Sequence, residues 1–339
     1  MAIDAPAPSR SLPANWRHAL RTCAPPQGEV DAISRWLVIA RACVFPMTLV
    51  AGAVAGLLAV RHESFDGLAF GLALVGIVLA HSSNNMINDY FDLRSGLDTA
   101  TYPRALYAPH PVLTGLIGKR ELLTAILAIN AADAAIMLIL VAARGWPIAA
   151  FAVAGLVVSV GYVAPPLRLK ARGLGEVGVF LVWGPLMVGG TYYAAVGDVD
   201  WKLVAASLPY GLLVMSVLMG KHIDKEPWDR DAGVSTLPVL MGESASRRVT
   251  AALLAAFYIG TVVLMVVGVY PVWTFAVAGA LPLFVRTART FARPKPETPP
   301  TDYPVWPLWF ASWAFVHSRR AGGFLVVGLA MGAVWPVFL

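Results

Sequence analysis

Residues 84–92 read NNMINDYFD, residues 96–98 continue as GLD, and residues 222–233 read HIDKEPWDRDAG. Each of these acidic clusters lies at the end of a long apolar run. Carboxylates at the ends of membrane-length segments are costly to keep near lipid, so they mark functional sites. Two such clusters, far apart in the sequence, predict one polar cavity that holds a divalent metal ion and a polyanionic substrate.

The apolar runs recur along the whole chain. Of the 339 residues, 58% are hydrophobic and only 14% are charged, whereas a soluble domain carries about 25% charged residues. A spanning helix needs about 20 apolar residues. Runs of roughly this length occur at 36–60, 67–88, 121–143, 147–165, 174–196, 203–221, 249–269, 271–291 and 321–339. We therefore expect an all-α polytopic membrane protein with about nine transmembrane helices.

The two ends of the chain differ from these spans. Residues 1–30 are polar, Pro-rich and without an apolar core, so we interpret them as a cytoplasmic tail with a disordered start rather than a signal peptide. Residues 31–339 are expected to form a single transmembrane domain. Near 303–320, several aromatic residues precede Arg319 and Arg320, a pattern typical of an interfacial helix at headgroup level. A tenth span is the alternative.

Basic residues indicate the orientation. With nine spans, only Arg61, Arg144 and Lys202 fall in the connections on one side. Basic residues of short loops stay in the cytoplasm, so the amino terminus and both acidic clusters are expected to face it. The formal charge of +6 then reflects topology. A nucleic-acid partner is not expected, because no basic run accompanies a reading motif.

The two cysteines carry little information. Cys23 and Cys43 lack the spacing of metal ligands. On the cytoplasmic side they are not expected to form a disulfide.

The first cluster has the pattern of a metal site. Asn85, Asp89 and Asp92 stand at i, i+4 and i+7, so on a helix they share one face. Two carboxylates and an amide oxygen suit Mg²⁺, which also binds substrate phosphate oxygens and waters. Asp98 follows Gly96, where the helix is expected to end, and could reach back to the same site. The alternative is a solvated helix end with capping acids.

The second cluster carries Asp224 and Asp229, five residues apart. On one uninterrupted helix they would point in different directions. Pro227 is expected to end the regular helix, which would leave Asp224 on the helix end and Asp229 in the next turn. An ordinary charged loop is the alternative.

Cations accompany the acids. A diphosphate needs bridging metal and basic side chains to balance its charge, and the candidates are Arg104, Arg168, Lys170, Lys221 and Lys225. His222 could act as a general base for a phenolic acceptor, since its ordinary pKa lies near neutral pH. The alternative for His222 is a local hydrogen bond to a loop carbonyl.

Together these residues resemble the UbiA superfamily of intramembrane prenyltransferases. Asn85, Asp89 and Asp92 with residues 96–98 resemble its first aspartate-rich motif, and Asp224 with residues 229–237 resembles its second. Residues 162–166 resemble the tyrosine–proline connection between them. Residues 173–193 are most similar to the branch that prenylates 1,4-dihydroxy-2-naphthoate in menaquinone synthesis. The resemblance covers roughly residues 35–290.

Two features depart from that pattern. The second motif usually spaces its leading aspartates by four residues rather than five. The naphthoate branch usually has paired asparagines where this chain has Lys221 and His222.

The resemblance implies nine helices around a central cavity with a cytoplasmic cap, in a bacterial cell (inner) membrane. It implies an isoprenyl diphosphate donor, an aromatic or other small lipophilic acceptor, and Mg²⁺. In this reading Asp89 and Asp92 hold one Mg²⁺, with Asn85 as an additional ligand, and Asp224 and Asp229 hold a second. Tyr162 orients the diphosphate or stabilises the allylic carbocation that forms when the donor ionises.

Three other functions stay open at this point. Within the family, the same ionisation could cyclise the prenyl chain, as in a terpene cyclase. The acceptor could instead be haem, a chlorophyllide, 4-hydroxybenzoate or a phosphoribosyl group. A secondary transporter would also place carboxylates at helix breaks, although nearer the middle of the membrane.

Overall fold

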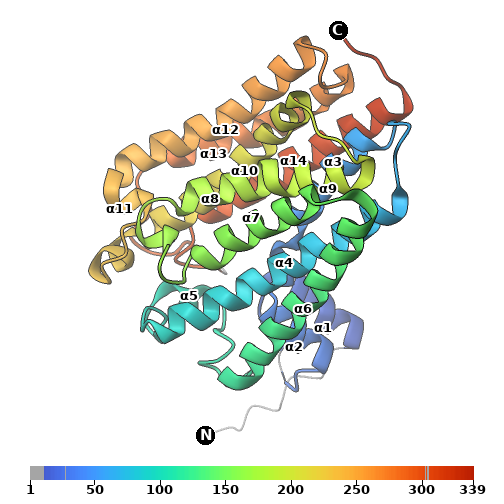
Figure 1. Ribbon diagram of the computed structural model, residues 1–339. Helices are drawn as coiled ribbons and strands as arrows, with labels where there is room; N and C mark the ends of the chain where they lie inside the picture. Colours follow the sequence, from blue (N-terminus) through green and yellow to red (C-terminus); the bar gives the residue numbers. More distant parts are fainter. Residues whose placement is uncertain (1–10, 27, 302, 304) are drawn as a thin grey trace, which may run out of the picture.

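The computed structural model describes residues 11–26, 28–301, 303 and 305–339. In this part of the chain the regular structure is helical, apart from one isolated bridge between Arg172 and Ser235. The elements, shown in Figure 1, are α1 (Leu12–Thr22), α2 (Ala32–Ile39), η1 (Ala42–Val44), α3 (Phe45–Ala59), α4 (Gly67–Arg94), α5 (Pro103–Tyr107), α6 (Lys119–Arg144), α7 (Pro147–Gly161), η2 (Leu169–Ala171), α8 (Gly175–Leu181), η3 (Val182–Leu186), α9 (Met187–Val196), α10 (Trp201–Asp231), α11 (Leu237–Met241), α12 (Glu243–Val266), η4 (Val272–Ala280), α13 (Leu281–Phe291) and α14 (Phe310–Val334).

The apolar runs of the sequence become long helices. Among the described residues, six helical segments are long and apolar enough to cross a membrane, judged by length and composition: Ala42–Ala59, Gly67–Arg94, Lys119–Arg144, Gly175–Val196, Trp201–Asp231 and Glu243–Val266. The expected all-helical membrane protein is confirmed at this level. The other three expected runs correspond to the shorter α7, to η4 with α13, and to part of α14.

The long helix α10 lies at the centre of the bundle. It contacts α12 and α14 on one side and α8 and η3 on the other. Helix α4 packs against α6 and α9, and α3 joins the two halves by contacting both α9 and α14. In Figure 1, α12, α13 and α14 accordingly lie on the opposite side of α10 from α4 and α6. The ends of α4 and α10 that carry the acidic clusters therefore belong to neighbouring halves of one bundle.

Helix α10 is continuous where the sequence predicted a break. It runs from Trp201 to Asp231 with Pro227 inside it, so the expectation that the chain unwinds at Pro227 is wrong. A helix turns about 100° per residue, and residues five apart therefore point about 140° away from each other. Asp224 and Asp229 consequently face different neighbours.

The aromatic segment near 303–320 also differs from the expectation. Helix α14 begins at Phe310 and continues through Arg319 and Arg320 to Val334. The aromatic stretch and the expected span at 321–339 therefore share one helix, rather than forming an interfacial helix followed by a separate span. The start at Phe310 has a local cause, because Asp224 accepts hydrogen bonds from the first amides of this helix.

The amino-terminal segment packs on the bundle through a covalent link. Helix α1 lies within the segment interpreted as a tail, while residues 1–10 lie outside the described residues. Cys23 and Cys43 form a disulfide, with their Cα atoms 5.4 Å apart. The expectation that these cysteines stay unpaired is therefore wrong. Left-handed residues at the end of α1 (Cys23) and before η1 (Arg41) turn the two segments toward each other.

Candidate active site

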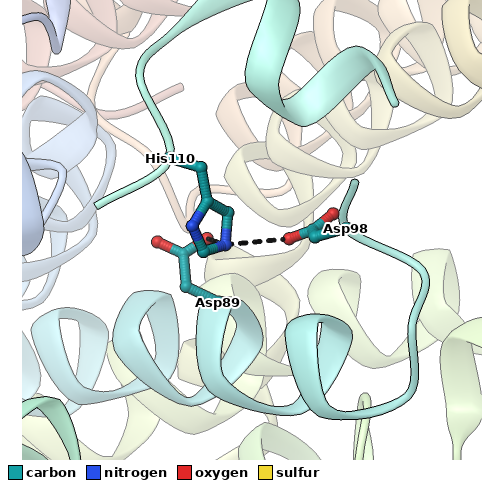
Figure 2. Close-up of side chains that lie close together, drawn as sticks. All are labelled: Asp89, Asp98 and His110. Carbon is teal, nitrogen blue, oxygen red and sulfur yellow. Dashed lines mark ion pairs between the residues drawn. The ribbon is translucent and has the colours of Figure 1, made fainter. Parts of the chain in front are cut away.

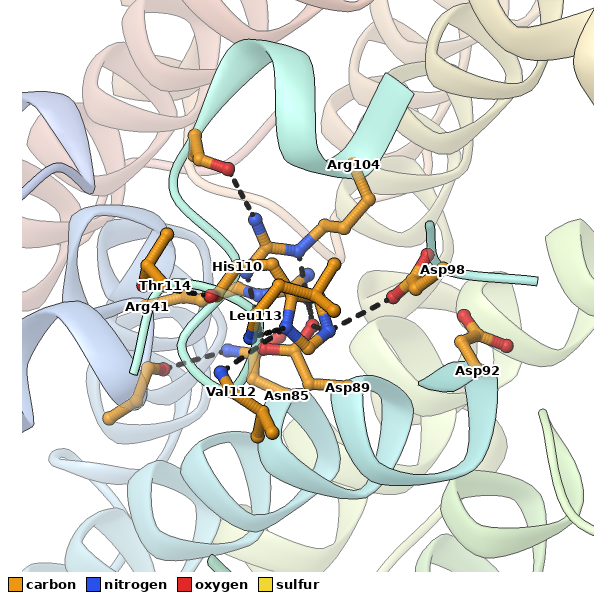
Figure 3. Close-up of polar contacts among 12 residues, drawn as sticks. Arg41, Asn85, Asp89, Asp92, Asp98, Arg104, His110, Val112, Leu113 and Thr114 are labelled. Atoms are coloured by element: carbon orange, nitrogen blue, oxygen red, sulfur yellow. Dashed lines mark hydrogen bonds and ion pairs between the residues drawn. The ribbon is translucent and has the colours of Figure 1, made fainter. Parts of the chain in front are cut away.

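Asp89 forms ion pairs with two arginines. It is buried on α4, and Arg41 from the turn before α3 pairs with its Oδ1. Arg104 of α5 donates from Nε to Oδ1 at 3.0 Å and from Nη2 to Oδ2 at 3.2 Å. Both carboxylate oxygens are therefore engaged by guanidinium groups (Figure 3). Burial alone would lower the pKa of Arg104, but Asp89 outweighs it and raises that pKa above its ordinary value.

His110 joins Asp89 to Asp98, as Figure 2 shows. His110 Nε2 lies 3.3 Å from Asp98 Oδ2 and 3.8 Å from Asp89 Oδ1. These three buried side chains could geometrically surround a cation. Two guanidinium groups on Asp89 would repel a divalent ion there, however. We therefore interpret this trio as an ion-pair cluster that anchors the segment after α4.

Asp98 returns to the end of α4 as its position in the sequence predicted. Gly96 takes φ +77°, a left-handed conformation that glycine adopts without strain. The turn is closed by the Leu97 and Asp98 amides, which donate to the Asp92 carbonyl at 2.9 and 3.1 Å. Burial would raise the pKa of Asp98, but His110, Lys225 and Arg104 lower it overall.

Asp92 faces a different cation from Asp89. Lys170 Nζ lies 2.7 Å from both of its carboxylate oxygens. Lys170 belongs to η2, in the connection between α7 and α8, which is bridged to the segment after α10 through Arg172 and Ser235. This connection thus brings a lysine to the first acidic cluster. Arg168, just before η2, is exposed and has a left-handed backbone at φ +45°.

Asp229 meets the segment that follows the first cluster. Its Oδ1 accepts a hydrogen bond from the Tyr102 hydroxyl, and Lys225 Nζ lies 3.6 Å from the same oxygen. Lys225 also lies 4.4 Å from the centroid of the Tyr102 ring. Burial and the neighbouring Asp229 raise the pKa of Tyr102 well above its ordinary value, so it stays a neutral donor.

Asp224 points away from this group. Its carboxylate accepts from the backbone amides of Phe310 at 3.1 Å and Ala311 at 2.8 Å, and Lys295 Nζ lies 3.5 Å from Oδ1. These contacts satisfy the first amides of α14, which lack partners inside their own helix. The structure therefore does not bring Asp224 together with Asp229.

Several oxygen atoms in the cluster have no donor among the described residues. They are Asn84 Oδ1, Asn88 Oδ1, Asp98 Oδ1 and Asp229 Oδ2, all buried. Buried acceptors of this kind are costly unless they are paired, and hard oxygen ligands suit Mg²⁺. We therefore take Asn88, Asp98 and Asp229, together with Asp92 of the same helix as Asn88, as candidate ligands of a divalent ion. The side-chain nitrogen of Asn85 donates to the Ala40 carbonyl at 3.0 Å, so only its Oδ1 could join them as a ligand.

A buried chain of three side chains comes from α8, α10 and the end of α7, and its α10 member, His222, lies three residues before Lys225. Glu176 Oε1 lies 2.7 Å from His222 Nδ1, and His222 Nε2 lies 3.2 Å from the Tyr162 hydroxyl. His222 thus contacts two side chains from other segments, and the alternative of a loop carbonyl as its partner is wrong. Burial raises the pKa of Tyr162 well above its ordinary value.

Tyr162 is one of the residues that line a largely apolar cavity. The cavity is bounded by α4, α6, α7 and the α8–η3–α9 segment, and its volume is about 170 Å³. Asn84 and Trp183 also line it, and Asp133 of α6 adds a carboxylate to its wall. A space of this size and character can hold a hydrocarbon chain or an aromatic ring.

Lys221 completes the basic side of the cluster, next to Tyr107. Burial would raise the pKa of Tyr107, but Lys221, Arg104 and Arg41 lower it overall. The electrostatic potential at the Tyr107 hydroxyl is therefore positive, even though the nearby aspartates are paired with cations. Such a field favours an anionic ligand.

Sequence reasoning missed five residues of this region: Arg41, Asn88, Tyr102, His110 and Glu176. Asn88 could have been found, because it stands four residues before Asp92 and shares its helix face. The other four had no local signal, because their partners lie between 12 and 127 positions away.

Comparison with known proteins identifies the family of this chain. Residues 49–313 match the UbiA prenyltransferase family. The chain belongs to this family, and it is a prenyltransferase.

The similar proteins agree with that assignment. The chain is 32% identical to the 1,4-dihydroxy-2-naphthoate octaprenyltransferase of Mycobacterium tuberculosis over 250 residues, 72% of this chain and 80% of the relative. It is 24% identical to the enzyme of the same name from Bacillus subtilis over 252 residues, 73% and 80% of the two chains. A solved UbiA homologue from Archaeoglobus fulgidus bound to GPP and Mg²⁺ shares the fold, with a TM-score of 0.56 and 15% identity, over 87% of this chain and 99% of that one.

Proposed function

We propose that this prenyltransferase moves a prenyl group from an isoprenyl diphosphate to an aromatic, quinone-precursor-like acceptor inside the membrane, and that it requires Mg²⁺. The names of the M. tuberculosis and B. subtilis relatives support the naphthoate-type acceptor. The A. fulgidus homologue, bound to GPP and Mg²⁺, supports the donor and the ion.

One observation carries the proposal most strongly. Tyr162 lines the apolar cavity, and its hydroxyl is linked through His222 to the helix that also presents Lys225 and Asp229. A prenyl diphosphate has the same division, with a hydrocarbon tail and a dense negative charge. Its tail suits the cavity, and its diphosphate suits the charged cluster.

In this function Asn88, Asp92, Asp98 and Asp229 would hold the divalent ion. When bound, Mg²⁺ supplies Lewis-acid neutralisation of the charge that develops on the diphosphate. This set differs from the one expected from the sequence, because Asp89 and Asp224 already have other partners, while Asn85 keeps its Oδ1 as a possible ligand.

The chain's own cations bind the leaving group. Lys170 holds Asp92 in the structure, and Lys221 and Lys225 lie in the same region. Lysines bind phosphate as point charges, so these three side chains stabilise the diphosphate. The carbon–oxygen bond breaks, and its electron pair leaves with the diphosphate. A ring carbon of the acceptor attacks the allylic carbocation, and the ring then loses a proton.

Tyr162 and the cavity protect the allylic carbocation from water. The neutral phenol presents electron density to the cavity that it lines, which stabilises a nearby cation. The apolar walls exclude water, which would otherwise capture the carbocation.

The topology proposed with this function has nine crossings: the six long segments, α7, the η4–α13 segment and α14. The charged cluster faces the cytoplasm of a bacterial cell, where the basic residues gather. Residues 31–339 act as one transmembrane domain, and the loops that carry Arg104 and Lys170 cover the site.

Product analysis tests the proposal. Membranes containing the protein are supplied with Mg²⁺, prenyl diphosphates of several lengths and a panel of quinone precursors, and the products are identified by mass spectrometry. We expect the mass of a prenylated aromatic, lost in Asp229→Asn and on chelation of the metal. A cyclic hydrocarbon formed without any acceptor would show a terpene cyclase instead.

A further inference from the structure

Lys225 occupies a position between the two acidic clusters. Its ammonium lies 3.6 Å from Asp229 Oδ1 and 4.4 Å from the centre of the Tyr102 ring, and its side chain is 5% exposed. Its charge also acts on Asp98, which comes from the first cluster. A tethered cation is therefore already held between Asp229 of α10 and Asp98, which follows α4.

The second cluster has few ligands left for a metal ion. Asp224 is committed to the first amides of α14 and to Lys295. The continuous helix turns it about 140° from Asp229, as described above. On the inner face of α10 the cluster thus offers one carboxylate, Asp229, and the ammonium of Lys225 beside it.

Asp89 of the first cluster cannot take the place of Asp224 as a metal ligand. Asp89 is engaged by Arg41 and Arg104. Three carboxylates then remain for metal, namely Asp92, Asp98 and Asp229, and two of them are already paired with lysines. A second divalent ion near Lys225 would also meet the repulsion of its positive charge.

We propose that this enzyme binds its diphosphate with a single divalent ion, and that the Lys225 ammonium takes the place of a second one by contacting the diphosphate directly. The inference rests on the proposed function, since it concerns the diphosphate donor. During transfer Lys225 balances the charge that arrives on the diphosphate with the electron pair of the broken carbon–oxygen bond. Its proton stays on the nitrogen throughout.

The test counts bound ions. Purified full-length protein in detergent is titrated with Mn²⁺, and free Mn²⁺ is measured by electron paramagnetic resonance, with a saturating unreactive prenyl thiolodiphosphate present. We expect one Mn²⁺ per wild-type chain. Lys225→Asp replaces the cation with a ligand and should bind a second Mn²⁺. Lys225→Met should keep one ion and bind the analogue at least tenfold more weakly.

The matched control removes a lysine from the far end of the same helix. Lys202 is exposed at the start of α10, and Lys202→Met should bind Mn²⁺ and the analogue like the wild type. Two Mn²⁺ per wild-type chain would overturn the proposal, as would unchanged affinity for the analogue in Lys225→Met. If the Lys225 variants do not fold, the wild-type stoichiometry alone decides.

The outcome is separable from that of the proposed function. A wild-type protein that prenylates an acceptor but binds two ions would refute only the single-ion inference. A protein that binds one ion with the analogue but makes no prenylated product would refute only the assigned reaction.

Discussion

Glu176 and His222 form a fully buried pair, with Oε1 of the carboxylate 2.7 Å from Nδ1 of the imidazole. A carboxylate can only accept a hydrogen bond, so Nδ1 carries the proton and Nε2 becomes the acceptor. With the imidazole neutral, the Tyr162 hydroxyl, 3.2 Å away, donates to Nε2. His222 is in this respect a positioning residue for Tyr162.

We expect Tyr162→Phe and His222→Ala to lower kcat by about tenfold each, the value of a hydrogen bond worth roughly 1.4 kcal/mol. KM for the diphosphate should stay unchanged, because neither side chain pairs with the charged cluster. The double variant should lose no more than either single one, since both remove the same interaction. Steady-state kinetics on the three variants, with thermal stability measured in parallel, provide the check. Multiplying losses would show that the two residues act independently.

Asp89 is expected to act on stability rather than on metal binding. Asp89→Asn leaves Arg41 and Arg104 buried without their counter-charge, and breaking a buried pair from one side costs about 3–5 kcal/mol. Thermal unfolding in detergent should therefore shift strongly downward. Asp92→Asn, at a more exposed carboxylate that pairs with one lysine, is the matched control and should lose less stability than Asp89→Asn while weakening Mn²⁺ binding. An Asp89→Asn protein that melts like the wild type but loses Mn²⁺ would return Asp89 to the metal site.

Substitution of Asp224 is expected to lower stability, whereas substitution of Asp229 is expected mainly to weaken metal binding. In Asp224→Ala, two amides at the start of α14 lose their acceptor, and the loss of such a cap costs about 1–2 kcal/mol. We expect a lower midpoint of thermal unfolding and unchanged Mn²⁺ affinity. Asp229→Asn should show weakened Mn²⁺ binding with a smaller change in stability. Loss of Mn²⁺ from a stable Asp224→Ala protein would contradict the structural role.

The outcomes at Asp89 and Asp224 show where sequence reasoning succeeds and where it stops. The run at 67–88 predicted α4 because a membrane fixes the length of an apolar helix, whatever its neighbours are. The roles of the aspartates depend on tertiary partners instead. Asp224 pairs with amides 86 and 87 positions later, and Asp89 with an arginine 48 positions earlier. No local pattern encodes such contacts.

The prediction that Pro227 ends the regular helix was wrong for a different reason. Proline removes one backbone donor and disfavours a helix interior, which is a local cost. Here the flanking residues of α10 pack on two sides of the bundle, against α12 and α14 and against α8. Tertiary packing therefore keeps the helix intact, and the direction of Asp224 follows from that continuity.

Gly220 sets how closely α10 and α14 approach beside Asp224. A Cβ on Gly220 would lie 2.9 Å from the backbone of Phe310 and Ala311. Backbone atoms cannot move aside as a side chain can, so Gly220→Ala should cost about 1–3 kcal/mol through overpacking. Gly323→Ala on α14, where a Cβ meets nothing within 4 Å, is the control and should not lower stability. Equal unfolding midpoints for the two variants would refute the close approach.

The disulfide between Cys23 and Cys43 bears on the orientation of the protein. The bond closes a loop over a sequence separation of 20, for which chain entropy predicts about 3 kcal/mol of stabilisation. Cytoplasmic reductants keep such bonds open, and the proposed topology has this end of the chain in the cytoplasm. We expect a closed bond in protein purified without reductant, and quenching intact cells with maleimide before lysis reports the state of the two cysteines in place. Mass spectrometry of the two samples distinguishes the states. A bond already closed in quenched cells would place the amino-terminal side in an oxidising compartment and reverse the proposed topology, while free thiols after purification would show that the pairing does not form.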